Sequence, residues 1–389
     1  MARGRIKVCP VSNGASLDSR RFSLGELEAL GYVTLGRGKV ISKEDIKSSP
    51  GGYPVYSSSA VGSGEIGRYG LFMFDDERIT WSIDGGGRLF YRPAHKYSVT
   101  NVCGWLKVNT SEISTRYLHL LLTARWQRLV FDYTYKAHPS VIRDAYQNLS
   151  FPNVQEQTRV SSVFDKLEKV IAQRKSQLDT LSNLVKSRFV EMFGDLVKND
   201  MGWAFSPLGK VCDVRDGTHA SPQYHMVGYP LMTSKNFTNG YEDFSDVKLI
   251  SKDDFDEINR RSRVDVGDIV MPMIGTIGSP VIITSNREFA IKNVSLIKFI
   301  DGSPNNVFVK AVLSSRYFQR IVDEKNRGNT QKFIALSDIR GFRIPLPPIA
   351  LQREFAAFVA KVDKLAFAIR KSLEAAEKLY RQQLSEAFS

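Results

Sequence analysis

The second half of this chain repeats the first half at an interval of 195 residues. Pro347 and Gln352 repeat Pro152 and Gln157, and a helical pattern of apolar residues follows each pair. The interval is unchanged at the phenylalanines that end both patterns, Phe193 and Phe388. Upstream the repeat is weaker but persists at a slightly shorter interval, with Asn293 192 residues after Asn101. A duplication this long predicts two globular units, each followed by a long helix.

The composition is that of a globular protein with an excess of basic residues. The 389 residues suggest two or three domains, and 54 Lys and Arg against 41 Asp and Glu give a formal net charge of +13. Nucleic acid is the first polyanion to consider as a partner, although ribosomal-type and membrane-surface proteins share such a charge. The three cysteines, Cys9, Cys103 and Cys212, are too far apart for a disulfide framework or a zinc knuckle. With no membrane span or signal peptide recognisable, we expect a soluble cytoplasmic protein.

The sequence divides into five segments. We expect a basic arm at 1–20, a first domain at 21–151, a helix at 152–195, a second domain at 196–346 and a second helix at 347–389. Within each domain, short β-rich runs alternate with clusters of Gly, Asn, Asp and Ser, and one internal helix follows. The predicted fold class is α+β: two similar strand-rich domains separated by two long helices. These helices are expected to form an antiparallel intramolecular coiled coil with pseudo-twofold symmetry.

Both long helices carry two interleaved rows of apolar residues at heptad spacing. Arg174 interrupts one row, and a polar residue in such a seam can fix the register. The alternative is an amphipathic helix that lies on its own domain. About 35 helical residues span roughly 50 Å, which is one to one and a half turns of B-DNA at about 34 Å per turn. The predicted seam residues are Val160, Phe164, Leu167, Ile171, Leu178, Leu181 and Val185 in the first helix, and Phe355, Val359, Val362, Ile369, Leu373, Ala376 and Tyr380 in the second.

Several sequence patterns resemble active-site motifs but lack the residues or the flanking elements that such sites require. Residues 62–67 match G-x-G-x-x-G, but a turn and a strand rather than a helix are predicted to follow, so a glycine-rich loop is the better interpretation. Asp246 and Lys248 have half of a nuclease metal motif without its upstream Pro-Asp pair. His219 and His225 lack a partner at metal-ligand spacing, so we expect no metal site. The sequence also lacks a phosphate-binding loop, a nucleophile elbow and the tetrapeptide of amino-methyltransferases. We therefore predict a DNA reader rather than an enzyme.

From about Phe22 onward the chain resembles the DNA specificity (S) subunits of prokaryotic type I restriction-modification systems. The similarity rests on 52–59 and 79–81 in the first unit, and on 216–219, 231–236, 267–270 and 275–278 in the second. The run Ile-Pro-Leu-Pro-Pro-Ile at 344–349 resembles the entry to the family's central helix. The first helix entry, at 149–153, is degenerate by comparison, and the arm before Arg20 has no recognisable counterpart.

The resemblance implies a non-catalytic subunit with two target-recognition domains. Each would recognise one half of an asymmetric, split site in double-stranded DNA, and the helices would act as a ruler between the halves. It also implies two copies of a methyltransferase (modification) subunit, and restriction/translocase subunits, as partners. S-adenosylmethionine, ATP and Mg²⁺ are then expected on those partners, with no cofactor and no catalytic residue on this chain. The rival hypotheses are a self-contained nuclease or methyltransferase, and a scaffold with an incidentally basic surface.

Base contacts are expected from loop side chains that can donate and accept hydrogen bonds, with Lys and Arg on phosphates. The alternative for each residue is an ordinary solvated loop. The loop around 327–332 is the most promising, because Gly, Asn and Gln lie there between two basic residues. The positions of these residues in the sequence do not determine which bases each half-site contains or how long the spacer between the half-sites is. The predicted DNA-binding residues are Ser57, Ser58, Arg88, Lys136 and His138 in the first unit, and Thr218, His219, Ser234, Lys235, Asn236, Arg327, Asn329, Gln331 and Lys332 in the second.

Overall fold

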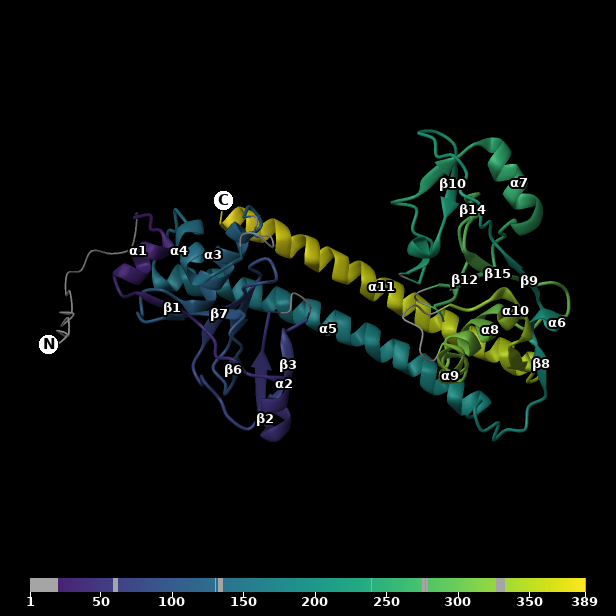
Figure 1. Ribbon diagram of the computed structural model, residues 1–389, viewed down its shortest axis with the longest axis horizontal. Helices are drawn as coiled ribbons and strands as arrows, with labels where there is room; N and C mark the ends of the chain where they lie inside the picture. The colour runs from purple at the N-terminus through teal and green to yellow at the C-terminus, as the bar shows by residue number, and fades with distance from the viewer. Residues whose placement is uncertain are drawn as a thin grey trace. The chain divides into compact units, whose positions relative to one another are not determined.

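The chain forms two compact units, each built from segments distant in sequence. The computed structural model describes residues 20–58, 62–129, 131, 136–238, 240–274, 277, 279–326 and 333–388. Unit 1 combines the described residues of Met1–Arg174 with those of Ser372–Ser389, and unit 2 consists of those of Lys175–Lys371. Each unit therefore holds one globular domain and a part of both long helices (Figure 1).

The domain of unit 1 is built on two small sheets. An antiparallel sheet has the order β1 (Val33–Arg37), β7 (Cys103–Val108), β4 (Arg78–Ser82) and β5 (Leu89–Arg92). A three-stranded sheet has the order β3 (Glu65–Tyr69), β2 (Pro50–Tyr56) and β6 (Ser98–Val99), with β2 parallel to β6. Strand β3 begins inside the glycine-rich run at 62–67 and continues to Tyr69, so this run leads into a strand and not into a helix. The helices of this domain are α1 (Leu24–Ala29), α2 (Lys43–Ser48), α3 (Thr115–Trp126) and α4 (Pro139–Ala145).

The domain of unit 2 repeats this plan with additions. Its antiparallel sheet has the order β13 (Val281–Ile282), β12 (Ile269–Pro272), β15 (Val294–Lys298) and β9 (Asp213–Asp216). Its three-stranded sheet has the order β11 (Lys248–Ile250), β10 (Tyr229–Met232) and β14 (Ala290–Ile291), with β10 parallel to β14. A third sheet pairs β16 (Arg343–Pro345) with β8 (Phe205–Pro207). The helices are α6 (Leu208–Val211), η1 (Ser234–Phe237), α7 (Lys252–Ser262), α8 (Asn306–Leu313), α9 (Arg316–Lys325) and α10 (Leu336–Gly341).

The two domains correspond strand by strand. Strands β1, β7, β4 and β5 occupy the same order as β9, β15, β12 and β13, and β6–β2–β3 corresponds to β14–β10–β11. The parallel pair recurs in both, and α3 and α8 follow the sheets at equivalent places. This confirms the mixed α+β, strand-rich architecture that the sequence predicts. Within the described residues, no helix is both long enough and apolar enough to cross a membrane.

The long helices α5 (Val154–Phe193) and α11 (Ile349–Ala387) run antiparallel within each unit. In unit 1 the ring of Phe164 lies 5.2 Å from that of Tyr380, and Arg174 Nε donates to Ser372 Oγ at 3.2 Å. Residue numbers thus fall along α11 as they rise along α5, which defines opposite directions. In unit 2 the rings of Phe189 and Phe355 lie 5.5 Å apart, and Arg188 pairs with Glu354 at 3.0 Å; Val185 and Val359 pack in the same cluster.

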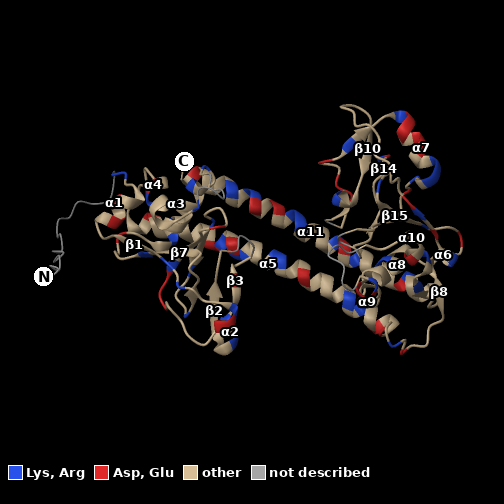
Figure 2. Ribbon diagram, viewed as in Figure 1, with Lys and Arg blue, Asp and Glu red and all other residues tan. Residues whose placement is uncertain are grey.

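Burial along both helices follows the heptad rows. Every predicted seam side chain is buried or half-buried, and Arg174 is half-buried among them. The positions between the rows are mostly exposed, and there Lys and Arg alternate with Asp and Glu (Figure 2). Each helix therefore packs against the other helix as well as against a domain.

The repeated glutamines explain why the sequence pattern is so strict at the helix entries. Gln157 is completely buried and Gln352 is 3% exposed. Gln157 Oε1 accepts from the backbone N–H of Ser114 (2.8 Å), and its amide donates to the carbonyls of Glu112 (2.8 Å) and Pro152 (2.7 Å). Gln352 does the same with Asn305 N–H (2.8 Å) and the Pro347 carbonyl (2.8 Å). Since Ser114 and Asn305 are the N-caps of α3 and α8, each glutamine ties a long helix to the start of an internal helix.

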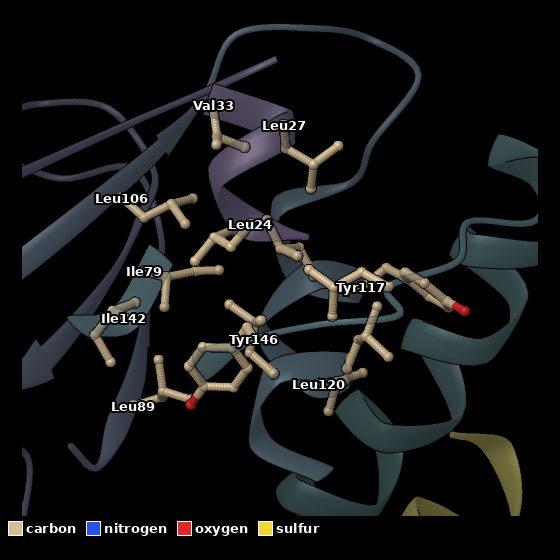
Figure 3. Packing of buried hydrophobic residues seen from close by; sticks show 14 of the residues in the cluster. Leu24, Leu27, Val33, Ile79, Leu89, Leu106, Tyr117, Leu120, Ile142 and Tyr146 are labelled. Carbon is tan, nitrogen blue, oxygen red and sulfur yellow. The ribbon is translucent and has the colours of Figure 1, made fainter. Parts of the chain in front are cut away.

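The core of each domain is completed by the end of a helix from the other half of the sequence. In unit 1, apolar side chains of α1, β1, β4, β7, α3 and α4 converge (Figure 3), and Phe388 of α11 packs on Tyr117 with ring centroids 5.3 Å apart. In unit 2, Phe193 of α5 packs on Phe308 at 4.7 Å. Full burial of one such ring contributes about 1.5–3 kcal/mol. The labelled residues in Figure 3 are Leu24, Leu27, Val33, Ile79, Leu89, Leu106, Tyr117, Leu120, Ile142 and Tyr146.

Candidate nucleic-acid interface

In unit 1, two predicted serines hold the chain that leaves β2. Ser57 Oγ lies 2.8 Å from Thr100 Oγ1, and Ser58 Oγ lies 2.6 Å from Ser82 Oγ. Ser58 Oγ also accepts from the backbone N–H of Asp84 at 2.9 Å. Ser57 thus joins the loop to the residue after β6, and Ser58 joins it to the end of β4; both serines are only half-buried.

The turn between β4 and β5 brings further predicted residues to the same place. Gly87 has a φ of 70°, and a Cβ there would lie 2.7 Å from the ring of Phe131, so glycine is required. Lys136 pairs with Asp84 (Nζ–Oδ1 3.0 Å), and the exposed guanidinium of Arg88 lies 5.2 Å from the ring centroid of Phe90. We call Ser57, Ser58, Asp84, Arg88 and Lys136 the unit 1 loop cluster; His138 lies beside it, half-buried at the N-cap of α4.

Two buried arginines lie opposite each other on β4 and β5, in the sheet behind this cluster. Arg78 makes two hydrogen bonds to Asp76 (2.7 and 3.1 Å) and stacks on Phe74 at 3.8 Å. Burial opposes ionisation of Asp76, but its hydrogen bonds from Arg78 and Lys107 hold its pKa below the ordinary value. Arg92, by contrast, has no carboxylate within salt-bridge distance in the described residues, and burial lowers its pKa.

In unit 2, the predicted Thr218 and His219 lie beside the turn that contains Asn293. His219 is exposed, and its two ring nitrogens lie 2.9 Å from Asp216 Oδ2 and 2.9 Å from Asn293 Oδ1. Arg261 also bonds Asp216, at 2.7 Å. Thr218 is half-buried, and its hydroxyl accepts from the backbone N–H of Ala220. Asn293, which repeats Asn101 in the sequence, is not among the predicted DNA-binding residues, but its side chain contacts His219, which is.

The remaining unit 2 residues divide into three groups. Lys235 is exposed and Ser234 half-buried in η1, where both are available at the surface. Asn236 is 5% exposed, and its side-chain amide is hydrogen-bonded to the N–H of Thr233 and to the carbonyls of Asp243 and Asp246. The four predicted residues Arg327, Asn329, Gln331 and Lys332 lie outside the described residues.

No group of three or more His, Cys, Asp or Glu among the described residues could hold a metal ion. Burial raises the pKa of the Cys103 thiol to about 12 and that of the Cys212 thiol to about 12, so neither is a thiolate at neutral pH. The exposed polar and cationic side chains of the two domains can donate and accept hydrogen bonds, which suits contacts to phosphates and base edges.

Comparison with known proteins points to one family. Residues 20–182 and 201–377 each match the model of the type I restriction modification DNA specificity domain. Among curated proteins, the putative type I specificity subunit S.MpnORF507P of Mycoplasma pneumoniae is 24% identical over 338 residues, which covers 82% of this chain and 84% of that protein. The specificity subunit of the type I restriction enzyme MpnII of the same organism is 34% identical over 184 residues, 44% of this chain and 54% of that protein.

The fold is also found in a solved structure. The crystal structure of a type I restriction-modification system S subunit from M. genitalium superposes with a TM-score of 0.59 at 14% identity. The match covers 95% of this chain and 96% of that chain. At this identity the likeness concerns the fold alone.

Proposed function

This chain belongs to the family of type I restriction-modification DNA specificity subunits, and we propose that it recognises an asymmetric, split DNA site. Each domain would recognise one half, and the paired helices would set the length of the unread spacer. The observation that carries this proposal is the strand-by-strand equivalence of two domains whose surface loops differ in chemistry. Serines and lysine gather in the unit 1 loop cluster, whereas Thr218, His219 and Asn293 gather in unit 2. Different side chains imply different half-sites.

Specificity subunits of type I systems are non-catalytic, so this chain is not an enzyme. We expect S-adenosylmethionine to bind the methyltransferase subunits, and ATP and Mg²⁺ to bind the restriction subunits. A complex that acts on the DNA of a prokaryotic cell would work in the cytoplasm.

A second apolar row on the long helices supports two copies of a methyltransferase partner. Val163, Val170 and Leu184 of α5 are exposed at heptad spacing outside the seam. Phe358, Leu365 and Leu379 of α11 repeat them at the interval of 195, with Leu365 and Leu379 exposed and Phe358 half-exposed. One apolar surface present twice suits two copies of one partner. We call these six residues the outer row.

Substitutions in the outer row test this stoichiometry. Val170→Glu and Leu365→Glu should each remove one methyltransferase copy from the assembled complex, measured by native mass spectrometry. Val190→Glu is the matched control, because Val190 is exposed on α5 but Ser385 stands at the repeated position. Retention of both copies by both outer-row variants would contradict this docking surface.

The ruler is tested by lengthening both helices together. Insertion of one heptad after Ser176 and one after Lys371 keeps both seams in register and adds about 10 Å. The methylated motif, measured by methylome sequencing of cells with and without the chain, should keep both half-sites and gain about three base pairs of spacer. An unchanged spacer would remove the ruler from the proposal. DNA binding by the full complex without sequence preference would instead favour the scaffold hypothesis.

A further inference from the structure

Arg92 is a buried cation on β5 of unit 1. It is 5% exposed, its guanidinium stacks on the ring of Tyr56 at 3.6 Å, and Nε donates to Thr80 Oγ1 at 3.0 Å. In the part of the chain that the structure describes, no carboxylate forms an ion pair with it. A buried charge without a counter-charge is destabilising, so its presence requires a reason.

Unit 2 supplies the internal comparison. On β4 and β5, Thr80 pairs with Phe90 and Arg92 lies two residues further on. On the equivalent β12 and β13, Val270 pairs with Val281 and Ile283 lies two residues further on. Val270 and Ile283 are both fully enclosed in an apolar cluster. The same fold therefore accepts isoleucine where unit 1 has arginine.

The contacts of Arg92 join the two arms of one loop. Tyr56, on which Arg92 stacks, is the last residue of β2 and directly precedes Ser57 and Ser58. Arg92 Nη2 donates to the carbonyl of Ser63 at 2.7 Å, on the arm that returns to β3. One side chain thus fixes where the chain leaves β2 and where it re-enters the sheet, beside the unit 1 loop cluster.

Asn236 makes equivalent connections after the equivalent strand of unit 2. Its Oδ1 accepts from the N–H of Thr233 at 2.9 Å, directly after β10. Its Nδ2 donates to the carbonyls of Asp243 (3.0 Å) and Asp246 (3.0 Å), on the arm that returns to β11. The two domains therefore hold corresponding loops with different side chains.

We propose that Arg92 and Asn236 are positioning residues for sequence recognition, each fixing the half-site of its own domain without contact to a base. Arg92 holds the loop after β2, and Asn236 holds the loop after β10. Loops that present Ser57 and Ser58, or Ser234 and Lys235, reach base edges only if both of their arms are fixed, since hydrogen bonds to bases are sharply directional. This inference rests on the proposed function.

The test compares methylated motifs in cells whose only copy of this chain is wild type, Arg92→Ile, Arg92→Lys, Asn236→Ala or Arg78→Met. Arg92→Ile should lower discrimination between bases roughly 10-fold in one half-site only, and Asn236→Ala should do so in the other half-site only. Arg92→Lys restores the charge but not the paired contacts, so it should behave like Arg92→Ile. Arg78→Met is the control: Arg78 is equally buried and stacked, but it contacts neither arm of the loop, so both half-sites should stay as in wild type.

Three results of this comparison would contradict the positioning role of Arg92 and Asn236. Wild-type discrimination in Arg92→Ile, full recovery in Arg92→Lys, or loss in the same half for Arg92→Ile and Asn236→Ala would overturn the inference. If Arg92→Ile lowers the amount of folded chain, Thr80→Val/Arg92→Ile, which reproduces the apolar pair of unit 2, is measured in its place under the same criteria. If the wild-type chain produces no split motif at all, the proposed function fails, and that result is distinct from a motif that Arg92→Ile leaves unchanged.

Discussion

Replacement of Gln157 by leucine should destabilise unit 1 more than the same change at Gln352 destabilises unit 2. The two glutamines are similarly buried, but among the described residues the side chain of Gln157 makes three hydrogen bonds to backbone groups and that of Gln352 makes two. Leucine has a similar volume and leaves those backbone groups without a partner. At about 1 kcal/mol for each buried group left unpaired, the cost is about 3 kcal/mol for Gln157→Leu and about 2 kcal/mol for Gln352→Leu.

Urea unfolding separates the two effects, because the tryptophans are unevenly distributed. Trp81, Trp105 and Trp126 lie in unit 1 and only Trp203 lies in unit 2, so fluorescence reports mainly on unit 1. Circular dichroism follows both units. Gln382→Leu is the control, since Gln382 is exposed and its amide donates to Glu386 one helical turn away; its cost should stay within about 0.5 kcal/mol. A cost for Gln157→Leu no greater than for this control, or smaller than for Gln352→Leu, would contradict the assignment of these hydrogen bonds as the source of stability.

Three further changes test the packing of the units. Burial and the charge of Arg116 lower the pKa of His119 to about 3, so the folded state binds fewer protons than the unfolded state. The free energy of unfolding should therefore be greatest above pH 6.5 and fall toward pH 5 by up to about 1.4 kcal/mol per pH unit. His119→Gln should remove this slope when unfolding is measured at a series of pH values. Arg116→Met should lower the free energy of unfolding in urea by about 1–2 kcal/mol, because Arg116 pairs with Asp165 (2.8 Å) and Glu168 (2.6 Å). These carboxylates are 58% and 44% exposed and regain water when the arginine is removed. A loss above about 4 kcal/mol would show that they are effectively buried. Phe193→Ala should cost about 3–5 kcal/mol and affect unit 2 first, whereas a neutral result would mean that the cavity collapses without loss.

The long helices were predictable because their signal is local. Apolar residues that repeat every seven positions can be recognised within the sequence of a single helix. Phe164, Leu178 and Val359 could therefore be assigned to the seam without knowledge of their contacts. The duplication extended the argument, since an equal interval at Gln157 and Gln352 implied an equal structural role. The role itself, hydrogen bonding to the N-cap of an internal helix, needed the structure, because Gln157 and Ser114 are 43 residues apart.

The interface was less predictable because loop side chains are placed by distant partners. Ser57 and Ser58 were recognised as polar loop residues, but their contacts to Thr100 and Ser82 depend on strand order in the sheet. Asn236 was also predicted to contact a base because it is a polar residue among loop formers, and its burial and its hydrogen bonds inside the domain could not be foreseen from that pattern. Ser57, Ser58 and Asn236 all lie among polar, turn-forming residues in the sequence, and only the burial of their side chains in the folded domain distinguishes them.

The repeating unit of the sequence is a domain followed by its helix, but the repeating unit of the structure is different. Tyr117 in unit 1 packs on Phe388, and Phe308 in unit 2 packs on Phe193. Each domain is thus completed by the helix end that belongs to the other sequence repeat. A chain cut after Lys371 would keep the whole first repeat, yet it would lose Leu384 and Phe388 from the core of unit 1. It follows that the two repeats stabilise each other through exchanged helix ends, and that a single repeat can bury its core only if a second copy supplies the missing end.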